Sequence, residues 1–116
     1  MILVKPDDVI EEKGEAYHGG SGHFSRRTLL QNIEGSEIKY VRDIIIPVGT
    51  IIGMHSHIDD EEIFYFISGN GTITVDGETQ KVSPGSVVLT LPGSSHGIEN
   101  NGESELRFIA ACVRNV

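Results

Sequence analysis

Two histidines and a glutamate stand close together near the middle of the chain, at positions 55, 57 and 62. Residues i and i+2 of a β-strand point to the same side, so a strand here presents the imidazoles of His55 and His57 to one point in space. Asp59 and Asp60 favour a turn, after which the strand-forming residues 62–67 bring the Glu62 carboxylate back beside the imidazoles. The convergence of two nitrogens and one oxygen predicts a metal site.

His96 is a fourth candidate ligand, and it follows an apolar strand candidate and a Pro-Gly turn. Imidazole nitrogens with a carboxylate oxygen suit one divalent transition metal per chain, Mn, Fe, Ni, Cu or Zn, better than Ca or Mg. Four such ligands leave two open positions on an octahedral ion. An oxygen-rich substrate, O₂ or a polarised carbonyl could bind there.

The composition restricts the class of protein and of partner. At 116 residues the chain is expected to form one domain with one core. Its formal net charge of −8 argues against nucleic acid or an anionic membrane as a partner, because both need a basic surface. No apolar run approaches a membrane span, and the first residues lack the features of a signal peptide. Because Cys112 is the single cysteine, no disulfide can form within the chain, and we expect a cytoplasmic location. The negative charge makes a small molecule the expected ligand.

Short apolar or alternating segments recur at even spacing along most of the chain. Turn signals containing glycine or proline separate them, and Asp76-Gly77 between two alternating strands is the clearest hairpin. Strands are expected over residues 25–30, 38–46, 50–54, 63–67, 72–75, 79–82, 86–91, 97–100 and 106–113. This pattern predicts an all-β sandwich or barrel, a class that includes double-sheet jelly rolls.

The first part of the chain gives weaker signals. Ile2–Val4 is a short strand candidate, and one helical turn is expected over Val9–Lys13. Residues 17–24 are rich in glycine but do not lie between a strand and a helix, so they lack the context of a phosphate-binding loop. We interpret this stretch as a connector or lid, with His18 and His23 as exposed loop histidines.

The two histidine-bearing stretches resemble the two sequence motifs of the cupin superfamily. The first motif, Gly-x5-His-x-His-x4-Glu-x6-Gly, matches at Gly49, His55, His57, Glu62 and Gly69. The second, Gly-x5-Pro-x-Gly-x2-His-x3-Asn, is similar to residues 85–100. One position departs, because Leu91 stands where the motif has proline and Pro92 follows it.

The resemblance implies a double-stranded β-helix, the jelly-roll barrel of cupins, over residues 28–116. A short N-terminal extension and the glycine-rich loop then occupy residues 1–27. The resemblance also implies that His55, His57, Glu62 and His96 hold the metal ion. Because Gly69 fits the six-residue gap from Glu62 and not from Glu61, the Glu61 side chain is expected to point the other way.

Several activities suit a protein that resembles a small single-domain cupin. Our leading hypothesis is a metal-dependent enzyme on a small oxygenated substrate, with oxygenase-like or Lewis-acid chemistry. One alternative is a non-catalytic, metal-bearing cupin that binds a small molecule or acts as a sensor. Another is an enzyme similar to sugar isomerases or small-acid decarboxylases. Isomerases and decarboxylases need a general acid or base besides the metal ligands, and the sequence offers no unambiguous one.

Strand parity predicts which other side chains face the metal. If Glu62 points inward, Phe64 and Phe66 do so too and form an aromatic wall, with ordinary core packing as the alternative. A substrate carboxylate suits an arginine, whose planar guanidinium offers paired donors. The candidates are Arg26, Arg27, Arg42 and Arg107. Arg42 is the leading one, because it lies mid-strand between Tyr40 and Ile44.

Several expected strands are apolar on both faces, notably residues 44–46, 63–67 and 87–91. An apolar outer surface needs a cover. We therefore expect a homodimer, in which Ile2–Val4 adds to the partner's sheet. Cys112 lies in an apolar strand and is interpreted as a packing residue.

Overall fold

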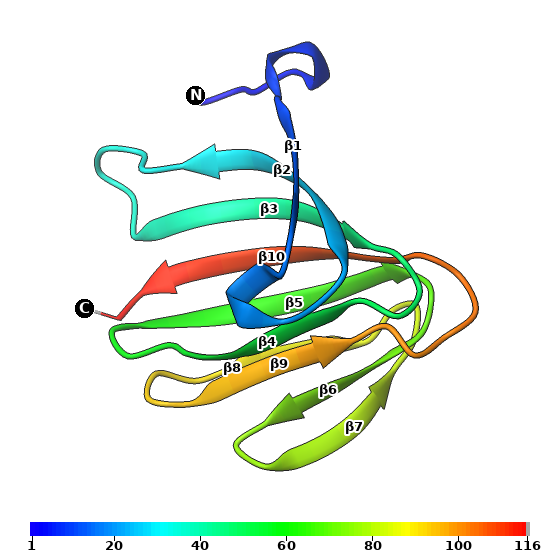
Figure 1. Cartoon of the computed structure of the whole chain (residues 1–116). Helices are drawn as coiled ribbons and strands as arrows, with labels where there is room; N and C mark the ends of the chain where they lie inside the picture. Colours follow the sequence, from blue (N-terminus) through cyan, green and yellow to red (C-terminus); the bar gives the residue numbers. More distant parts are fainter. Residues whose placement is uncertain (116) are drawn as a thin grey trace.

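The computed structural model describes residues 1–115 and consists almost entirely of β-strands (Figure 1). The predicted all-β class is confirmed. Within these residues the elements are, in chain order, η1 (Pro6–Asp8), β1 (Glu11–Glu15), η2 (Tyr17–Gly19), β2 (His23–Gln31), β3 (Ile38–Ile46), β4 (Ile51–Ser56), β5 (Asp60–Ser68), β6 (Gly71–Val75), β7 (Glu78–Val82), β8 (Val87–Thr90), β9 (Ser95–Glu99) and β10 (Leu106–Arg114).

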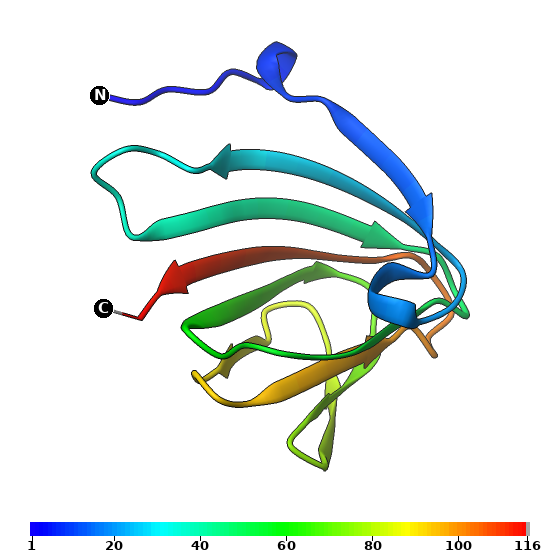
Figure 2. The ribbon, with the colours of Figure 1, turned by 60° about the vertical axis from the view of Figure 1, so that its left-hand side comes forward.

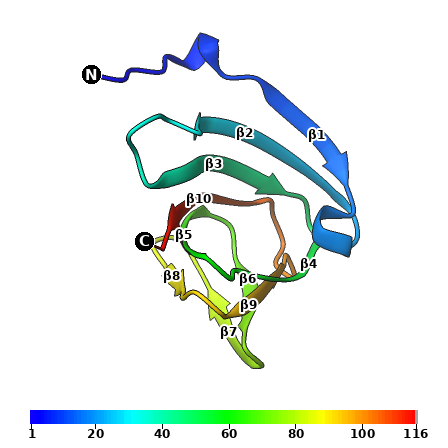
Figure 3. The same cartoon turned by 90° about the vertical axis from the view of Figure 1, so that its left-hand side faces the viewer.

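The strands form two antiparallel sheets. The larger has the order β1-β2-β3-β10-β5-β8, and the smaller has the order β4-β9-β6-β7. Consecutive strands such as β3 and β4 belong to different sheets, so the chain passes back and forth between them. Figure 3 shows the two sheets curving around a common interior. This arrangement is the double-stranded β-helix that the sequence predicted.

Alternating side chains of β5 and β10 fill the space between the sheets. Phe66 and Phe108 are fully buried and opposite each other in register, with ring centroids 5.3 Å apart. The intervening β5 residues Ile63, Tyr65 and Ile67 point outward, as strand parity predicted. Since Glu62 shares the inward face with the two phenylalanines of β5, the same alternation that builds the core aims its carboxylate inward.

The hairpin between β6 and β7 has the two-residue turn that the sequence indicated. Val75 pairs with Glu78, and Asp76 and Gly77 between them have φ angles of 47° and 82°. Positive φ at both central positions is typical of the type I′ turn, which matches the twist of the strands it joins. This prediction is confirmed.

An ionic cluster on the outer face of the larger sheet accounts for two of the four candidate arginines. The Asp43 carboxylate is 3% exposed and accepts hydrogen bonds from Arg107 Nη2 at 2.8 Å and from Arg27 Nη2 at 2.6 Å. The bond from Arg107, with that from Arg27, holds the pKa of the Asp43 carboxyl below its usual range despite burial. These bonds turn Arg27 and Arg107 away from the interior.

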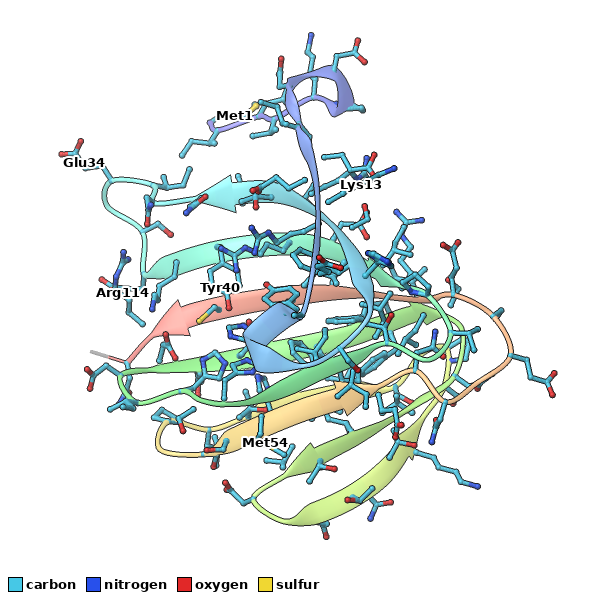
Figure 4. The ribbon with its side chains drawn as sticks, in the orientation of Figure 1. Met1, Lys13, Glu34, Tyr40, Met54 and Arg114 are labelled. Atoms are coloured by element: carbon cyan, nitrogen blue, oxygen red, sulfur yellow. The ribbon has the colours of Figure 1, made fainter. Side chains whose placement is uncertain are left out.

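The structure corrects two predictions for the N-terminal segment. Ile2–Val4 form no strand; they are exposed and lie beside β2 at the edge of the larger sheet (Figures 2 and 4). The helical turn lies at Pro6–Asp8 and not over Val9–Lys13. Proline suits the first position of a helical turn, whereas Glu11–Glu15 gain backbone hydrogen bonds by pairing with β2, which an isolated turn would not supply.

β2 crosses the predicted boundary, between residues 27 and 28, that separates the N-terminal extension from the barrel. In residues 1–115, neither helical segment is long and apolar enough to cross a membrane.

Candidate metal centre

Four side chains, from three strands and one adjoining loop, meet inside the barrel. His55 lies on β4, His57 just after its end, Glu62 on β5 and His96 on β9. Glu62 Oε1 is 2.9 Å from His57 Nε2 and 3.1 Å from His96 Nε2. His96 Nε2 is in turn 3.0 Å from His55 Nε2 and 3.1 Å from His57 Nε2. The structure thus brings together all four residues that the sequence proposed as ligands.

Strand pairing explains how His96 reaches the other ligands. His55 and His96 are directly opposite each other in the β4–β9 register. The turn before β9 keeps its form although Leu91 replaces the expected proline, because Ser94 N donates to Leu91 O at 3.1 Å and Gly93 has a φ of 90°. The departure from the second motif therefore leaves the direction of His96 intact.

The second ring nitrogen of each histidine also has a partner. His55 Nδ1 donates to the Gly53 carbonyl at 2.8 Å, and His57 Nδ1 donates to Asp60 Oδ1 at 2.7 Å. His96 Nδ1 lies 2.7 Å from the Thr90 hydroxyl. Because Nδ1 of His55 and of His57 donates to these partners, Nε2 of each ring faces the centre, where it can bind an ion once any proton on it is lost. This is the pattern that orients histidines around a metal ion.

The spacing of the donor atoms fits a single transition-metal ion. Metal–nitrogen and metal–oxygen bonds in such sites are about 2.1 Å long, so two donors at right angles on one ion lie about 3.0 Å apart. The four measured separations run from 2.9 to 3.1 Å. Three imidazoles and one carboxylate therefore suit an ion with octahedral angles and with positions left for a ligand.

Protonation states at the centre also favour metal binding. Burial by itself raises the pKa of the Glu62 carboxyl, but hydrogen bonds from His57, His96 and Tyr40 outweigh it and leave that pKa lowered. Burial lowers the pKa of His55 to about 4, so its ring is neutral at pH 7. The Glu62 carboxylate raises the pKa of His57 instead. A metal ion that displaced the proton between His57 Nε2 and Glu62 Oε1 would keep the Glu62 carboxylate as its neighbour.

Tyr40 is a site residue that sequence reasoning missed. Tyr40 and Glu62 both pair with Cys112 in register, on β3 and β5 respectively, so the three lie in one row across the larger sheet. The Tyr40 hydroxyl donates to Glu62 Oε2, and its side chain extends from β3 as Figure 4 shows. Burial and the Glu62 charge raise the pKa of this hydroxyl, which stays protonated. The sequence did carry a signal for Tyr40. It lies two residues from Arg42 on the same strand, so the two side chains point to the same side.

His18 was interpreted as an ordinary loop histidine, and the structure places it in the site. Its ring stacks on His55 with centroids 3.6 Å apart and 13° between the planes. The η2 segment can approach β4 this closely because each side of the contact has a glycine, Gly53 on β4 and Gly20 directly after η2. A Cβ on Gly53 would lie 2.0 Å from the His18 carbonyl oxygen, and one on Gly20 would lie 1.8 Å from the Ile51 carbonyl oxygen.

A small cavity of about 20 Å³ opens between this segment and the candidate ligands. Its lining combines two candidate ligands, the η2 aromatic residues, Tyr40 and apolar core residues. The lining residues are Tyr17, His18, Tyr40, Ile44, Ile52, His55, Glu62, Phe64 and Phe108. The cavity is thus bounded by aromatic rings on one side and by candidate metal ligands on the other.

Of the three residues predicted to contact the substrate, only Phe64 lines this cavity. Its ring stacks on His96, with centroids 4.8 Å apart. Phe66 lies outside the cavity, packed against Phe64 and Phe108. Arg42 stands beside it, with its guanidinium carbon 3.8 Å from the centroid of the Tyr40 ring. Arg26 donates to the Tyr17 hydroxyl at 3.2 Å on the rim.

The neighbours of the candidate ligands on β5 and β10 are also placed. Glu61 is half-buried and has the opposite parity to Glu62, as expected. Cys112 is fully buried, and burial raises the pKa of its thiol to about 12, in agreement with a packing role.

Comparison with known proteins places the fold in a family. A family model described as Cupin domain matches residues 42–112, more than half of the chain and all four candidate ligands. The chain belongs to the cupin domain family. An uncharacterized protein from Methanocaldococcus jannaschii is 31% identical over 109 residues, which are 94% of this cupin and 87% of that protein.

A curated sequence and a crystal structure from Thermotoga maritima both have names that refer to oxalate. One is named oxalate-binding protein and is 27% identical over 113 residues, 97% of this cupin and 93% of that protein. The other is the crystal structure of a predicted oxalate decarboxylase, which matches with a TM-score of 0.91 and 27% identity over 97% of this cupin and 99% of that chain. The polyketide cyclase RemF from Streptomyces resistomycificus, 23% identical with a TM-score of 0.74, covers all of this cupin with 85% of its own chain and shares the fold.

Proposed function

We propose that this cupin holds one divalent transition-metal ion on His55, His57, Glu62 and His96 and uses it to bind a small carboxylate of the oxalate class. The observation that carries the proposal is the convergence of three Nε2 atoms and one carboxylate oxygen at spacings that suit one ion. The donor set is compatible with Mn, Fe, Ni, Cu or Zn. The bound ion would supply Lewis-acid chemistry, or redox chemistry if it is Fe, Mn or Cu.

The surroundings of the centre support a small anionic ligand. Arg42 carries a positive charge beside the cavity, and its Nε is buried without a hydrogen-bond partner among residues 1–115. A buried guanidinium nitrogen without a partner is costly, and a ligand carboxylate would provide one. The T. maritima relative named oxalate-binding protein supports the same ligand class.

Catalysis is favoured by two titratable side chains that line the same cavity, His18 and Tyr40. Decarboxylation of oxalate breaks its carbon–carbon bond, releases CO₂ and adds a proton to the remaining carbon to give formate. The reaction needs a proton donor and no oxidant. The His18 ring or the Tyr40 hydroxyl stands where such a proton is required. Detection of formate by NMR after incubation with ¹³C-oxalate distinguishes an enzyme from a binding protein.

Oxalate is expected to bind the metal-loaded protein and not the apo-protein, as measured by titration calorimetry after elemental analysis of protein purified without a chelator. The Arg42→Gln variant should retain its metal and bind oxalate about tenfold more weakly or worse, because a charge-assisted hydrogen bond is worth about 1.5–3 kcal/mol. Arg114→Gln, on the exposed end of β10, is the matched control. A wild-type protein that contains metal but gives no heat with oxalate would refute this choice of ligand.

We further propose a homodimer that covers the outer face of β5 and β8. Ile63 pairs with Leu89 and Tyr65 with Val87, and these four side chains are 40–62% exposed. With Ile67, they form a continuous apolar patch of a kind that monomers rarely leave open. The N-terminal arm, residues 1–4, adds further exposed apolar side chains that a second copy of the chain could cover.

Light scattering at low micromolar concentration should give the mass of a dimer. Leu89→Asp should shift the mass to that of a monomer, because it buries a charge at the centre of the interface. Val48→Asp, an equally exposed apolar position on the loop after β3, should leave the dimer intact. A monomeric mass for the wild-type chain rules this proposal out.

A further inference from the structure

Asp60 is a buried carboxylate at the start of β5, at a position where the sequence favours a turn. It is 7% exposed, whereas the adjacent Asp59 is exposed. One carboxylate oxygen, Oδ1, accepts the Nδ1 proton of His57 at 2.7 Å. The other, Oδ2, accepts a hydrogen bond from Lys39 Nζ on β3 at 2.6 Å. Asp60 therefore links a candidate metal ligand to a cation on another strand.

Among the three histidines of the centre, only His57 has a charged partner at Nδ1. His55 uses a backbone carbonyl and His96 uses the Thr90 hydroxyl. His57 also differs in its place on the backbone, because it lies just beyond the end of β4, where its amide donates to Ser94 O at 2.9 Å. The orientation of its ring is fixed at Nδ1 by a side chain from β5.

We propose that Asp60 is a positioning residue of the metal centre, which keeps the proton of His57 on Nδ1 and the Nε2 lone pair directed at the ion. This inference rests on the proposed metal site. An ionised carboxylate can only accept a hydrogen bond, so it disfavours the tautomer with the proton on Nε2, which has no lone pair there to offer the ion. Lys39 holds the carboxylate in its ionised form and in place. The negative charge also makes the imidazole a stronger donor to a cation.

The surroundings of Asp60 argue against a second metal site at the same place. His57, Asp60 and Cys112 offer donor atoms within 4.8 Å of one another. The Lys39 ammonium already occupies the cationic position on Asp60, and the thiol of Cys112 is fully buried in its protonated form. The positioning role needs no further ion and accounts for both oxygens of the carboxylate.

The test compares Asp60→Asn with the exposed control Asp59→Asn. Asparagine keeps the size of the side chain but can turn its NH₂ toward His57 and so favour the tautomer that cannot bind metal. Metal affinity, measured by competition with a chromophoric chelator, should fall about 10–100-fold in Asp60→Asn and stay unchanged in Asp59→Asn. Long-range ¹H–¹⁵N NMR of the apo-protein, recorded at a pH at which the His57 ring is neutral, should show its proton on Nδ1 in the wild type and a shift toward Nε2 in Asp60→Asn.

The outcomes separate this inference from the function on which it rests. A wild-type protein that binds no metal refutes the proposed function, and with it any role of Asp60 toward an ion. If the wild type binds metal and Asp60→Asn matches it in affinity and in the His57 tautomer, only the positioning role is wrong. A second equivalent of metal that is lost in both Asp60→Asn and Cys112→Ala would make Asp60 a ligand and overturn the positioning role as well.

Discussion

The Glu62→Ala variant is expected to lose stoichiometric metal and to keep its β-fold. Glu62 supplies the only carboxylate of the proposed ligand set, and its Oε1 lies within 3.1 Å of two of the three histidine Nε2 atoms. Its removal takes away one ligand and the negative charge that offsets the charge of the ion. Elemental analysis should show about one metal per chain in the wild type and about none in the variant, with unchanged far-UV circular dichroism.

Glu61→Ala is the matched control for this experiment, because Glu61 is a neighbouring acid on the same strand with the opposite parity. It should retain the metal. His57→Ala should behave like Glu62→Ala. Metal added to apo-protein should raise the midpoint of thermal unfolding of the wild type and of Glu61→Ala but not of Glu62→Ala, since a ligand stabilises the folded state by about 2.7 kcal/mol at 100 times its Kd. Equal metal content in all variants would show that the site lies elsewhere.

Phe66→Ala is expected to lower the free energy of unfolding by about 3–5 kcal/mol, as measured by urea denaturation, without changing metal content. The Phe66 ring is fully buried against Phe64 and Phe108 and lies outside the cavity at the candidate metal centre. Its truncation leaves a void in the core, and the loss is a large part of the total stability of a domain of this size. The site itself loses no donor.

Phe64→Ala provides the comparison, because Phe64 also lines the cavity and stacks on His96. It should destabilise the fold and weaken oxalate binding as well, whereas Phe66→Ala should affect stability alone. Val48→Ala, at an exposed loop position, should cost less than about 0.5 kcal/mol. Oxalate binding that is weakened as much in Phe66→Ala as in Phe64→Ala would restore the original prediction that both rings contact the substrate.

The sequence by itself predicted the features that depend on local period and spacing. A strand turns its side chains alternately in and out, so the shared inward direction of Glu62 and Phe64 follows from their numbering. The Asp76-Gly77 hairpin follows from the φ angles that those two residues tolerate. The two motif spacings predicted the barrel and the four residues that meet inside it.

Tertiary structure alone decided which side chains surround those four. Tyr40 and Glu62 are 22 positions apart, and they meet because β3 and β5 both pair with β10. Lys39 reaches Asp60 by the same pairing, and His18 reaches His55 because two glycines let the η2 segment approach β4. Parity states to which side of a strand a residue points, but it carries no information about which strand is its neighbour. The neighbour is set by contacts between distant segments, so the supporting shell of the centre could be known only once the chain was folded.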